Sequence, residues 1–443
     1  MALVIPEPII EVGNDVFDDR DLLGRRELGK RLSDLVERLD DPVVIALDGG
    51  WGSGKTFFLK FWTGSHQKLN EGSARVIYFD AFENDYLDDP LTSIVGVISD
   101  QPSQVSWNRK ALKGVKTAAA KLARPVIRMG LAAVTAGLTE VAGVVADSVI
   151  VSGQKSLEQS VNDFWKREDG KRAAMADFRA GLRKLTAPDA NGNPAQKIVL
   201  VVDELDRCRP TYALSVLETI KHFFSVPGVH FILGTNLDAL ANSVKASYGQ
   251  SIDAERYLQK FIHIRMPLRM RYWENGFRGE AEIYWEWVSE QLGSNKNGYG
   301  EGIKEYLTLI QKVELPSLRE IQRIGTLSLI VPKHTGRCML DWYLICGLIV
   351  LQVVRPDLVE LGRKGELTFA EVYRHLWQKS SPPPSDHSHA KILEAWKYAL
   401  EEHLVISEEA EREWVQGGVI SNHRSTRVLK LIEIFLDVFQ LQG

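Results

Sequence analysis

The stretch Gly49-Gly50-Trp51-Gly52-Ser53-Gly54-Lys55-Thr56 is a complete GxxxxGK[ST] pattern, and it decides the fold. A short apolar run at 43–47 precedes it, and an apolar helical stretch that begins at Phe57 follows it. In the order strand, glycine-rich loop and helix, backbone N–H groups converge on phosphate oxygens at the N-terminus of the helix. The stretch therefore predicts a phosphate-binding loop, called here the P-loop (residues 49–56).

The P-loop predicts a bound nucleotide together with a metal ion. We expect the Lys55 ammonium to reach the β- and γ-phosphates of ATP, and the Thr56 hydroxyl to bind Mg²⁺, which bridges the same phosphates. Phe57, directly after the motif, completes the predicted nucleotide-binding set. A glycine-rich turn without a ligand is the plain alternative, but the strand before the loop and the helix after it count against that interpretation.

Further strands and helices alternate along the first part of the chain. Apolar runs with the length and β-branched content of buried parallel strands lie at 75–79, 198–202 and 230–234. Helical patterns lie at 21–40 and 211–224. This alternation predicts a doubly wound α/β layer.

The second part of the chain has a different pattern. Residues 271–443 lack comparable strand runs and contain long helical patterns, at 303–313, 317–331 and 424–440. We therefore expect a helical C-terminal region. One segment of biased composition, Ser380-Ser381-Pro382-Pro383-Pro384-Ser385, indicates an extended linker or loop.

A second acidic site follows the strand at 198–202. Asp203 ends this strand directly, as in a Walker B motif, and is expected to hold Mg²⁺ directly or through water. Glu204 is placed to orient and deprotonate the attacking water, and Asp206 offers a third carboxylate. The spacing does not decide whether Glu204 or Asp206 is the catalytic base. Ordinary acidic residues at a strand end are the plain alternative.

Asn236 is a candidate sensor of the nucleotide. It lies just beyond the run at 230–234, where a polar side chain can position the attacking water or the γ-phosphate. A Thr-Asn pair at the end of a strand is as often only a turn or a helix cap. We weigh the two interpretations evenly.

Composition limits the other classes of function. The 443 residues favour two or three domains, and the apolar and charged contents of 44% and 25% are those of a globular protein. A net charge of -4 counts against a globally basic nucleic-acid binder. The three cysteines, Cys208, Cys338 and Cys346, are widely spaced and predict neither disulfides nor a zinc site. With no signal-peptide pattern at Met1, we expect a cytoplasmic protein.

Several motifs together resemble the KAP family of P-loop NTPases. They are Asp21-Leu22-Leu23-Gly24-Arg25, the P-loop with Trp51, Phe79-Asp80-Ala81-Phe82-Glu83, Asp203-Glu204-Leu205-Asp206-Arg207-Cys208 and Tyr257-Leu258-Gln259-Lys260-Phe261. The resemblance covers residues 15–330. It implies an α/β P-loop NTPase of the additional-strand type, distantly AAA+- and STAND-like, with a helical insertion and a helical C-terminal domain. Bacterial members are similar to anti-phage defence ATPases, and animal members to membrane-associated signalling scaffolds.

The resemblance also implies domain limits and further site residues. We expect the first half of the NTPase domain at 15–100, an insertion at 101–160, the second half at 161–270, and a helical lid and C-terminal domain at 271–443. Arg319 and Arg323 match a family position in the helical lid, where an arginine contacts the γ-phosphate; a solvated helix face is the alternative. Glu204 and Asn236 both stand where many family members carry Asp. The glutamate at 204 favours hydrolysis, and the asparagine at 236 leaves the sensor chemistry open.

The insertion offers a possible contact with a membrane or a partner. A basic stretch at 109–128 leads into an apolar segment at 129–151, but Glu140 and Asp147 disfavour a single clean span, since each costs about 3 kcal/mol at the bilayer centre. Both carboxylates lie on one helix face, opposite an apolar face. Packing against protein, peripheral association with the inner face of a membrane through 109–151, and a flexible segment are the three interpretations, in that order.

Arg256 is a candidate for action between subunits. An arginine after the sensor strand can reach the nucleotide of a neighbouring copy and stabilise transition-state charge, although pairing with Glu255 or Asp253 is the plainer alternative. This interpretation expects a homo-oligomer.

The function predicted from these residues is Mg²⁺-dependent ATP hydrolysis that drives or times the assembly of a partner complex, in anti-phage defence. A nucleotide-gated signalling or scaffold module with little turnover is the alternative. A small-molecule kinase is disfavoured, because this sequence shows no segment that would bind a phosphate acceptor. A nucleic-acid motor is not favoured, because the basic stretch lacks interleaved aromatic residues.

Overall fold

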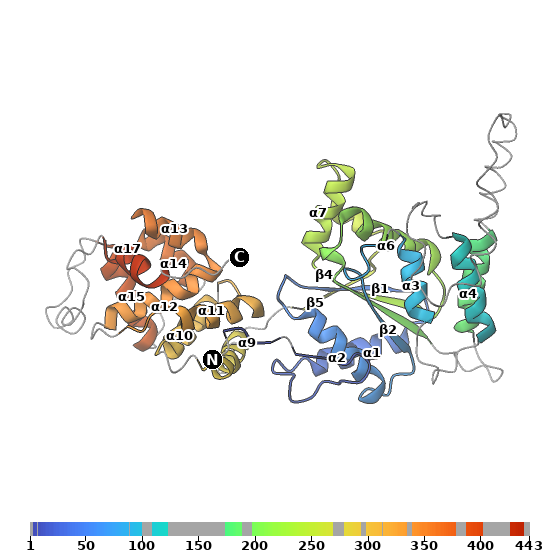
Figure 1. Cartoon of the computed structure of the whole chain (residues 1–443), viewed down its shortest axis with the longest axis horizontal. Helices are drawn as coiled ribbons and strands as arrows, with labels where there is room; N and C mark the ends of the chain where they lie inside the picture. The colour runs from blue at the N-terminus through green and yellow to red at the C-terminus, as the bar shows by residue number, and fades with distance from the viewer. Residues whose placement is uncertain are drawn as a thin grey trace, which may run out of the picture. The chain divides into compact units, whose positions relative to one another are not determined.

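The computed structural model describes residues 3–6, 8–87, 89–99, 109–122, 173–187, 197–268, 279–293, 298–311, 313–334, 339–377, 387–401 and 426–437 (Figure 1). The chain divides into two compact units. The first consists of residues 1–29, 48–62 and 267–443, and the second of residues 30–47 and 63–266. The P-loop thus belongs to the unit that carries the C-terminal helices, and the sheet belongs to the other.

The second unit is built on a five-stranded sheet. Its strands are β1 (Val44–Asp48), β2 (Arg75–Asp80), β3 (Ile198–Asp203), β4 (Val229–Thr235) and β5 (Ile264–Pro267), in the order β2-β3-β4-β1-β5. The pairs β2–β3 and β3–β4 are parallel, with Asp80 opposite Asp203. Strand β4 therefore separates the strand before the P-loop from the strand that ends in the acidic motif, as the additional-strand prediction requires.

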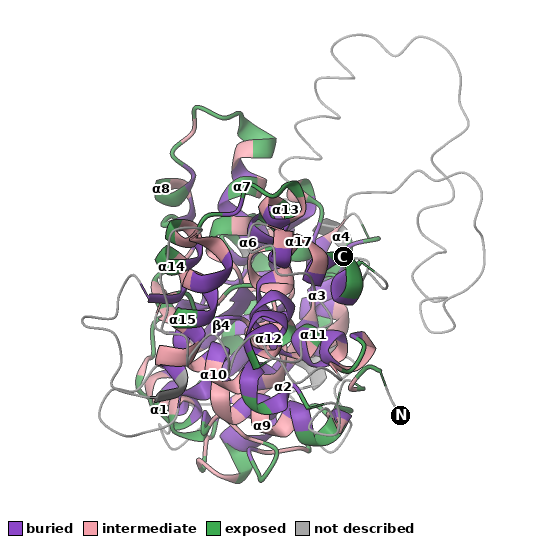
Figure 2. Ribbon diagram, turned by 90° about the vertical axis from the view of Figure 1, so that its left-hand side faces the viewer, coloured by how far each residue is buried: buried purple, intermediate pink, exposed green. Residues whose placement is uncertain are grey.

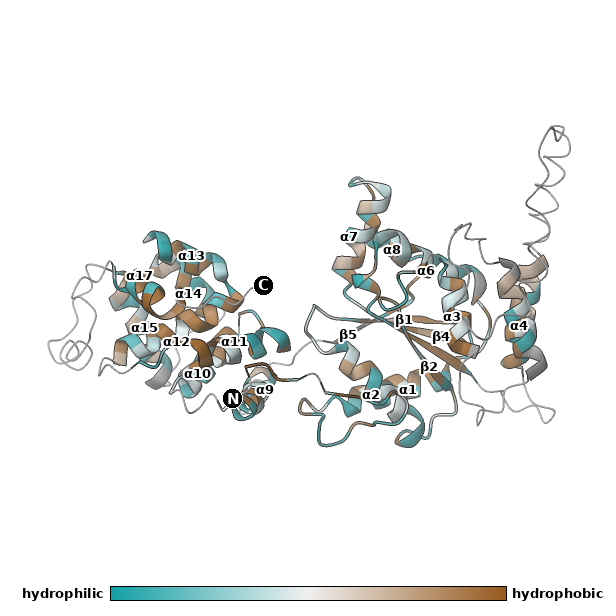
Figure 3. Cartoon of the chain, in the orientation of Figure 1, coloured by the Kyte–Doolittle hydropathy of each residue, from teal (hydrophilic) through white to brown (hydrophobic). Residues whose placement is uncertain are grey.

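Burial explains why these strands form. Every residue of β1, β3 and β4 is buried, and each strand is mostly apolar, with brown around the labels of β1 and β4 in Figure 3. The four predicted strands are confirmed with limits shifted by about one residue. Strand β5 was not predicted, because its residues alternate between half-buried and exposed and one of them is Arg265.

Helices alternate with these strands along the chain. They are α1 (Arg26–Arg38), α2 (Lys55–Lys68), α3 (Pro90–Ser99), α4 (Arg109–Leu122), η3 (Leu205–Arg207), α6 (Pro210–Phe223), α7 (Leu237–Tyr248) and α8 (Ala254–Leu258), with a further helical stretch at 173–185. Of the predicted patterns, 21–40 and 211–224 are confirmed as α1 and α6. The unit has its own core, to which β2, β3, β4, α3, α6 and α7 contribute.

The first unit contains the helical C-terminal domain. Its helices are α9 (Glu280–Leu292), α10 (Gly300–Ile310), α11 (Leu318–Ile330), α12 (Met339–Val354), α13 (Pro356–Lys364), α14 (Phe369–Trp377), α15 (His387–Leu400) and α17 (Arg427–Leu431), followed by the π-helical turn η6 (Ile432–Leu436). The expected helical domain is confirmed. Helix α12 is its centre, since eleven of its residues are buried, and buried residues are purple in Figure 2.

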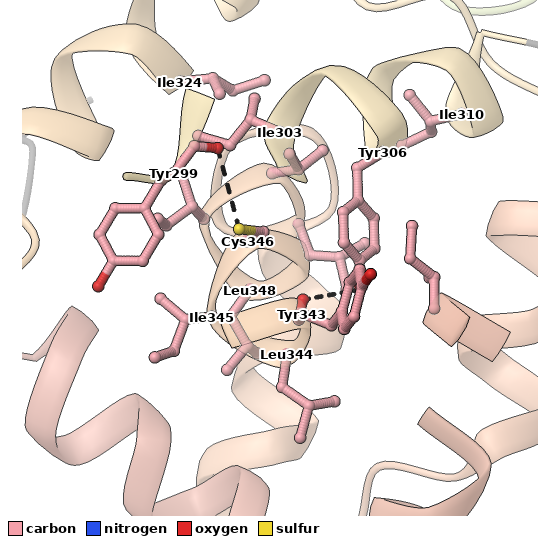
Figure 4. Packing of buried hydrophobic residues seen from close by; sticks show 14 of the residues in the cluster. Tyr299, Ile303, Tyr306, Ile310, Ile324, Tyr343, Leu344, Ile345, Cys346 and Leu348 are labelled. Atoms are coloured by element: carbon pink, nitrogen blue, oxygen red, sulfur yellow. Dashed lines mark hydrogen bonds between the residues drawn. The ribbon is translucent and has the colours of Figure 1, made fainter. Parts of the chain in front are cut away.

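Two sets of polar groups in this helical core are paired. Tyr306 donates to the carbonyl of Tyr343 at 2.9 Å (Figure 4). It also accepts from the indole of Trp396 at 2.7 Å. Arg427 of α17 lies 2.7 Å from Asp341 of α12, and both side chains are almost fully buried. These contacts fix the helices against one another, because a buried polar group without a partner is costly.

Only the first part of the 109–151 segment can be described. Helix α4 buries Val115, Ala118 and Ala119 in the core of the second unit and leaves Lys113 and Lys116 exposed. Residues 123–172, which include the apolar segment with Glu140 and Asp147, lie outside the described residues. Among the described helices, none has the length and apolar character needed to span a membrane.

Candidate functional site

The P-loop has the backbone that its glycines predict. Gly52 and Gly54 have φ angles of 78° and 84°, which residues with a Cβ adopt only with strain. A Cβ on Gly49 would also lie 2.6 Å from the Ser53 Oγ. Helix α2 begins within the P-loop, at Lys55, and its first N–H groups have no acceptor within the helix. This is a backbone arrangement that suits an anion at a helix N-terminus.

Polar side chains of the P-loop fit a phosphate ligand. The Lys55 ammonium donates to the carbonyl oxygens of Gly49 at 2.7 Å and Gly50 at 3.2 Å, so it lies across the loop. The Ser53 Oγ is buried and has no hydrogen-bond partner among the described residues. A cation over the loop and an unsatisfied hydroxyl within it are what phosphate oxygens would bind. Trp51 is 59% exposed.

Arg25, which the sequence marked only as part of a family motif, contacts the P-loop. Its Nη1 donates to the Ser53 carbonyl at 2.9 Å, and its Nη2 lies 3.9 Å from the Glu280 Oε2 of α9. The Arg25 side chain is buried. No local pattern predicts this contact, because the two partners lie 28 and 255 residues away.

Helix α11 begins against the P-loop. Ser317 caps it in a capping box with Glu320, and the Leu318 N–H donates to the Gly52 carbonyl at 3.1 Å. A Cβ on Gly52 would lie 2.7 Å from the Arg319 Cβ. The structure therefore brings the backbone of Arg319, one of the two predicted lid arginines, to the P-loop. The side chains of Arg319 and Arg323 are exposed.

In the second unit, Asp203 is held at the carboxyl end of β3. It is fully buried; its Oδ2 accepts from the Tyr78 hydroxyl at 2.8 Å and its Oδ1 from the Glu204 N–H at 2.9 Å. Burial and the Asp203 carboxylate raise the pKa of Tyr78, so this phenol stays a donor. These bonds fix the carboxylate in one orientation, which suits an aspartate that binds a metal ion.

Glu204 has a strained backbone. Its φ of 58° is left-handed, one of two such non-glycine residues in the described part of the chain. The side chain pairs with Arg207, whose Nη1 lies 2.9 Å from the Glu204 Oε1. Burial raises the pKa of Glu204, as do Asp80, Asp203 and Asp206, while Arg207 opposes the shift. Strain of this kind, about 1–3 kcal/mol, clusters at functional sites.

The remaining carboxylates gather around the same strand end. Asp206 lies in η3 and is 9% exposed, and Asp80 faces Asp203 across the β2–β3 pair. Asp80, which the sequence did not mark as a site residue, accepts from the Glu83 N–H at 2.9 Å. The described residues hold no cluster of three metal-ligating side chains of the all-protein type. A Mg²⁺ ion bound to nucleotide phosphates does not need such a cluster, since one or two protein ligands suffice.

Asn236 caps α7. Its side-chain oxygen accepts from the N–H groups of Asp238 and Ala239 at 3.1 and 3.3 Å. The side-chain oxygen of Asn236 therefore acts as a helix cap. A sensor role of its side-chain amide nitrogen stays a prediction. The preceding residue, Thr235, is fully buried at the end of β4, and its hydroxyl has no partner among the described residues. Thr235 is a polar candidate that the sequence analysis missed.

Arg256 lies in the short helix α8. The Asp253 carboxylate caps this helix by accepting from the Arg256 N–H at 3.0 Å. The Arg256 side chain is exposed and forms no ion pair with any residue that the structure describes, Glu255 and Asp253 included. An exposed arginine remains available to another molecule.

The fold and the motifs define a class and then a family. A sheet in which β4 separates the P-loop strand from the acidic strand, with a GxxxxGK[ST] loop, is that of an additional-strand P-loop NTPase. The KAP family P-loop domain matches residues 25–330. The chain belongs to this family, as its motifs predict.

Other comparisons give remote structural similarity. No curated protein sequence matches the chain. The ORC2 protein of Aeropyrum pernix, solved as ADPNP-ADP complexes, is 12% identical over 96% of both chains, with a TM-score of 0.31. Cdc6p from Pyrobaculum aerophilum is 14% identical over 93% of this chain and 90% of its own, with a TM-score of 0.35. The ORC1 protein of A. pernix, solved with DNA, is 12% identical over 93% of this chain and 82% of its own, with a TM-score of 0.31.

Proposed function

We propose that the chain binds ATP with Mg²⁺ and hydrolyses it, and that hydrolysis drives or times the assembly of a partner complex. The P-loop carries the proposal: two left-handed glycines, a lysine across the loop and an unsatisfied serine hydroxyl suit a triphosphate. Thr56 and Asp203 are the proposed magnesium ligands. The metal would offset negative charge on the phosphates when bound.

The chain's own residues have separate tasks in this proposal. Lys55 and the loop N–H groups bind the β- and γ-phosphates in the ground state. Glu204 orients the attacking water and accepts its proton. Asp206 is the second candidate for that task.

Substitution of single residues separates binding from hydrolysis. We expect Lys55→Ala to weaken ATP binding, and Glu204→Gln to preserve binding while it lowers kcat by about 10²- to 10⁴-fold, the usual contribution of a general base. Asp206→Asn is the matched control. Loss of turnover in Asp206→Asn with normal turnover in Glu204→Gln would transfer the base to Asp206. Normal turnover in both variants would contradict carboxylate-assisted hydrolysis.

One observation favours the alternative of a nucleotide-gated module with little turnover. The candidate base, Glu204, is already bound to Arg207 at 2.9 Å. A base engaged in this way would act only after Arg207 moves. Slow basal hydrolysis that rises in Arg207→Gln would support this second function, and fast basal hydrolysis would exclude it.

The biological setting that we propose is anti-phage defence, on the ground of the family resemblance alone. Cells that carry the gene with its genomic neighbours should plate phage less efficiently than cells that carry the Lys55→Ala variant. Equal plating efficiency over a broad phage panel would contradict this setting and leave the hydrolysis proposal standing.

A further inference from the structure

Two consecutive carbonyl groups of the P-loop are bound from outside the loop. The Gly52 carbonyl accepts from the Leu318 N–H of α11 at 3.1 Å, and the Ser53 carbonyl accepts from Arg25 at 2.9 Å. In a trans peptide the C=O and N–H groups point in opposite directions. The bond at the Ser53 carbonyl therefore also sets the direction of the Gly54 N–H, a candidate phosphate donor.

Arg25 is suited to hold this peptide group in place. Its side chain is 7% exposed, and its backbone N–H is fixed by the Asp21 carboxylate at 3.0 Å. The guanidinium is a rigid fork, so one nitrogen can bind the Ser53 carbonyl while the other faces Glu280. The buried Glu280 carboxylate compensates the buried positive charge.

Helix α11, which contacts the P-loop, and helix α9, which contacts Arg25, are joined to each other. Gln322 of α11 donates to the Tyr284 hydroxyl of α9 at 2.7 Å. Gly325 of α11 packs so closely on α9 that a Cβ there would lie 2.7 Å from a Val288 methyl. Packing this close makes α9 and α11 one body. The contacts thus form a ring from the P-loop through Arg25, α9 and α11 back to the P-loop.

We propose that Arg25 is a positioning residue that couples the nucleotide state of the P-loop to the α9–α11 pair. A phosphate that draws the Gly54 N–H turns the whole Ser53–Gly54 peptide group, and with it the carbonyl that Arg25 holds. Arg25 passes this displacement to Glu280 at the first turn of α9. The inference rests on nucleotide binding at the P-loop, and it does not require hydrolysis.

Amide hydrogen exchange with a non-hydrolysable ATP analogue tests the coupling in the full-length protein. In the wild type, saturating analogue should slow exchange in the P-loop, in α9 and in α11. Arg25→Gln should bind the analogue about 10- to 100-fold more weakly, the value of a lost charge-assisted bond. At saturation it should still protect the P-loop, but it should protect α9 less than the wild type does, since only the Leu318–Gly52 bond of α11 then remains. Arg25→Lys keeps the positive charge but lacks the planar guanidinium fork. Relative to Arg25→Gln, it should restore most of the affinity for the analogue but little of the protection of α9.

Two variants make the result independent of a folding defect. Glu280→Gln keeps the bond between Arg25 and Ser53, so its affinity should change by less than about threefold while protection of α9 falls. Arg26→Gln alters the neighbouring, exposed arginine and should behave as the wild type. Full protection of α9 in Arg25→Gln or in Glu280→Gln, or no response of α9 in the wild type, would overturn the coupling. Because the analogue is not hydrolysed, an inactive enzyme would leave this result readable.

Discussion

The Tyr78 hydroxyl on β2 donates to the buried Asp203 carboxylate on β3 at 2.8 Å. Tyr78→Phe deletes that donor and leaves a buried carboxylate oxygen less well satisfied. We expect a loss of about 1–3 kcal/mol in the free energy of unfolding and a higher Mg²⁺ concentration for half-maximal ATPase activity. Denaturant titration and a magnesium titration measure these effects. Tyr86→Phe is the control, since Tyr86 is 74% exposed; equal effects in both variants would refute a special role for Tyr78.

Gly52 and Gly50 offer a matched pair in the P-loop. Gly52→Ala places a Cβ at a φ of 78° and 2.7 Å from the Arg319 Cβ, whereas a Cβ on Gly50 meets nothing within 4 Å. We expect Gly52→Ala to lower the melting temperature by several degrees, since a strained residue costs about 1–3 kcal/mol, and Gly50→Ala to change it little. Calorimetry of the two variants checks this. Equal stability would show that α11 does not constrain the loop at Gly52.

Thr235 and Asn236 compete for the role of nucleotide sensor. Asn236→Asp keeps a helix-capping oxygen and removes the amide donor, and Thr235→Val keeps the shape and removes the buried hydroxyl. A sensor variant should lower kcat at least about tenfold with little change in KM, because the contact forms in the transition state. If only Thr235→Val does so, the buried hydroxyl is the sensor. If neither does, the end of β4 does not contact the reacting groups.

His230 makes the stability of the second unit depend on pH. Burial, assisted by the positive charge of Lys197, lowers the pKa of His230 from 6.5 to about 4. Below pH 6.5, His230 therefore binds a proton in the unfolded chain, whereas in the folded chain it stays neutral until the pH falls to about 4. The contribution of His230 to the free energy of unfolding is fully present above pH 6.5, and it falls by about 3 kcal/mol as the pH drops to 4. Denaturant titrations at pH 7.5 and 5 should differ less in His230→Phe than in the wild type, and an unchanged difference would refute this assignment.

Arg256 is expected to act on the nucleotide of a neighbouring copy. If it does, specific activity should rise with protein concentration, and a mixture of Arg256→Ala with Lys55→Ala subunits should recover activity that neither has alone. Glu255→Gln, on the same short helix, is the control and should retain activity. Hydrolysis that does not depend on concentration, in a protein that stays monomeric with ATP bound, would leave Arg319 and Arg323 as the remaining candidates.

The sequence predicts those parts of the molecule that local physical chemistry determines. Strands β1, β3 and β4 are buried on both faces, so they appear as apolar runs, and the glycines of the P-loop appear where the backbone needs left-handed φ angles. Strand β5 is half exposed and gives no such signal.

Other features depend on residues that are distant in the chain. The bond from Arg25 to the Ser53 carbonyl and the register that places Asp80 opposite Asp203 are set by tertiary structure. The left-handed backbone of Glu204 is a property of the folded turn, since glutamate has no preference for it. The motifs therefore located the candidate site, and the contacts that shape it required the structure.

The pair of Arg427 and Asp341 sets a limit on how the chain can be shortened. Asp341 is buried in the first turn of α12, and its positively charged partner, Arg427, comes from α17, near the end of the described residues. A chain cut before Arg427 would retain every P-loop residue, yet it would remove the counter-charge of Asp341, and a buried carboxylate that loses its partner costs about 3–5 kcal/mol. A fragment designed around the family's 25–330 span that keeps α12 would inherit this defect unless Asp341 were also replaced, for example by Leu.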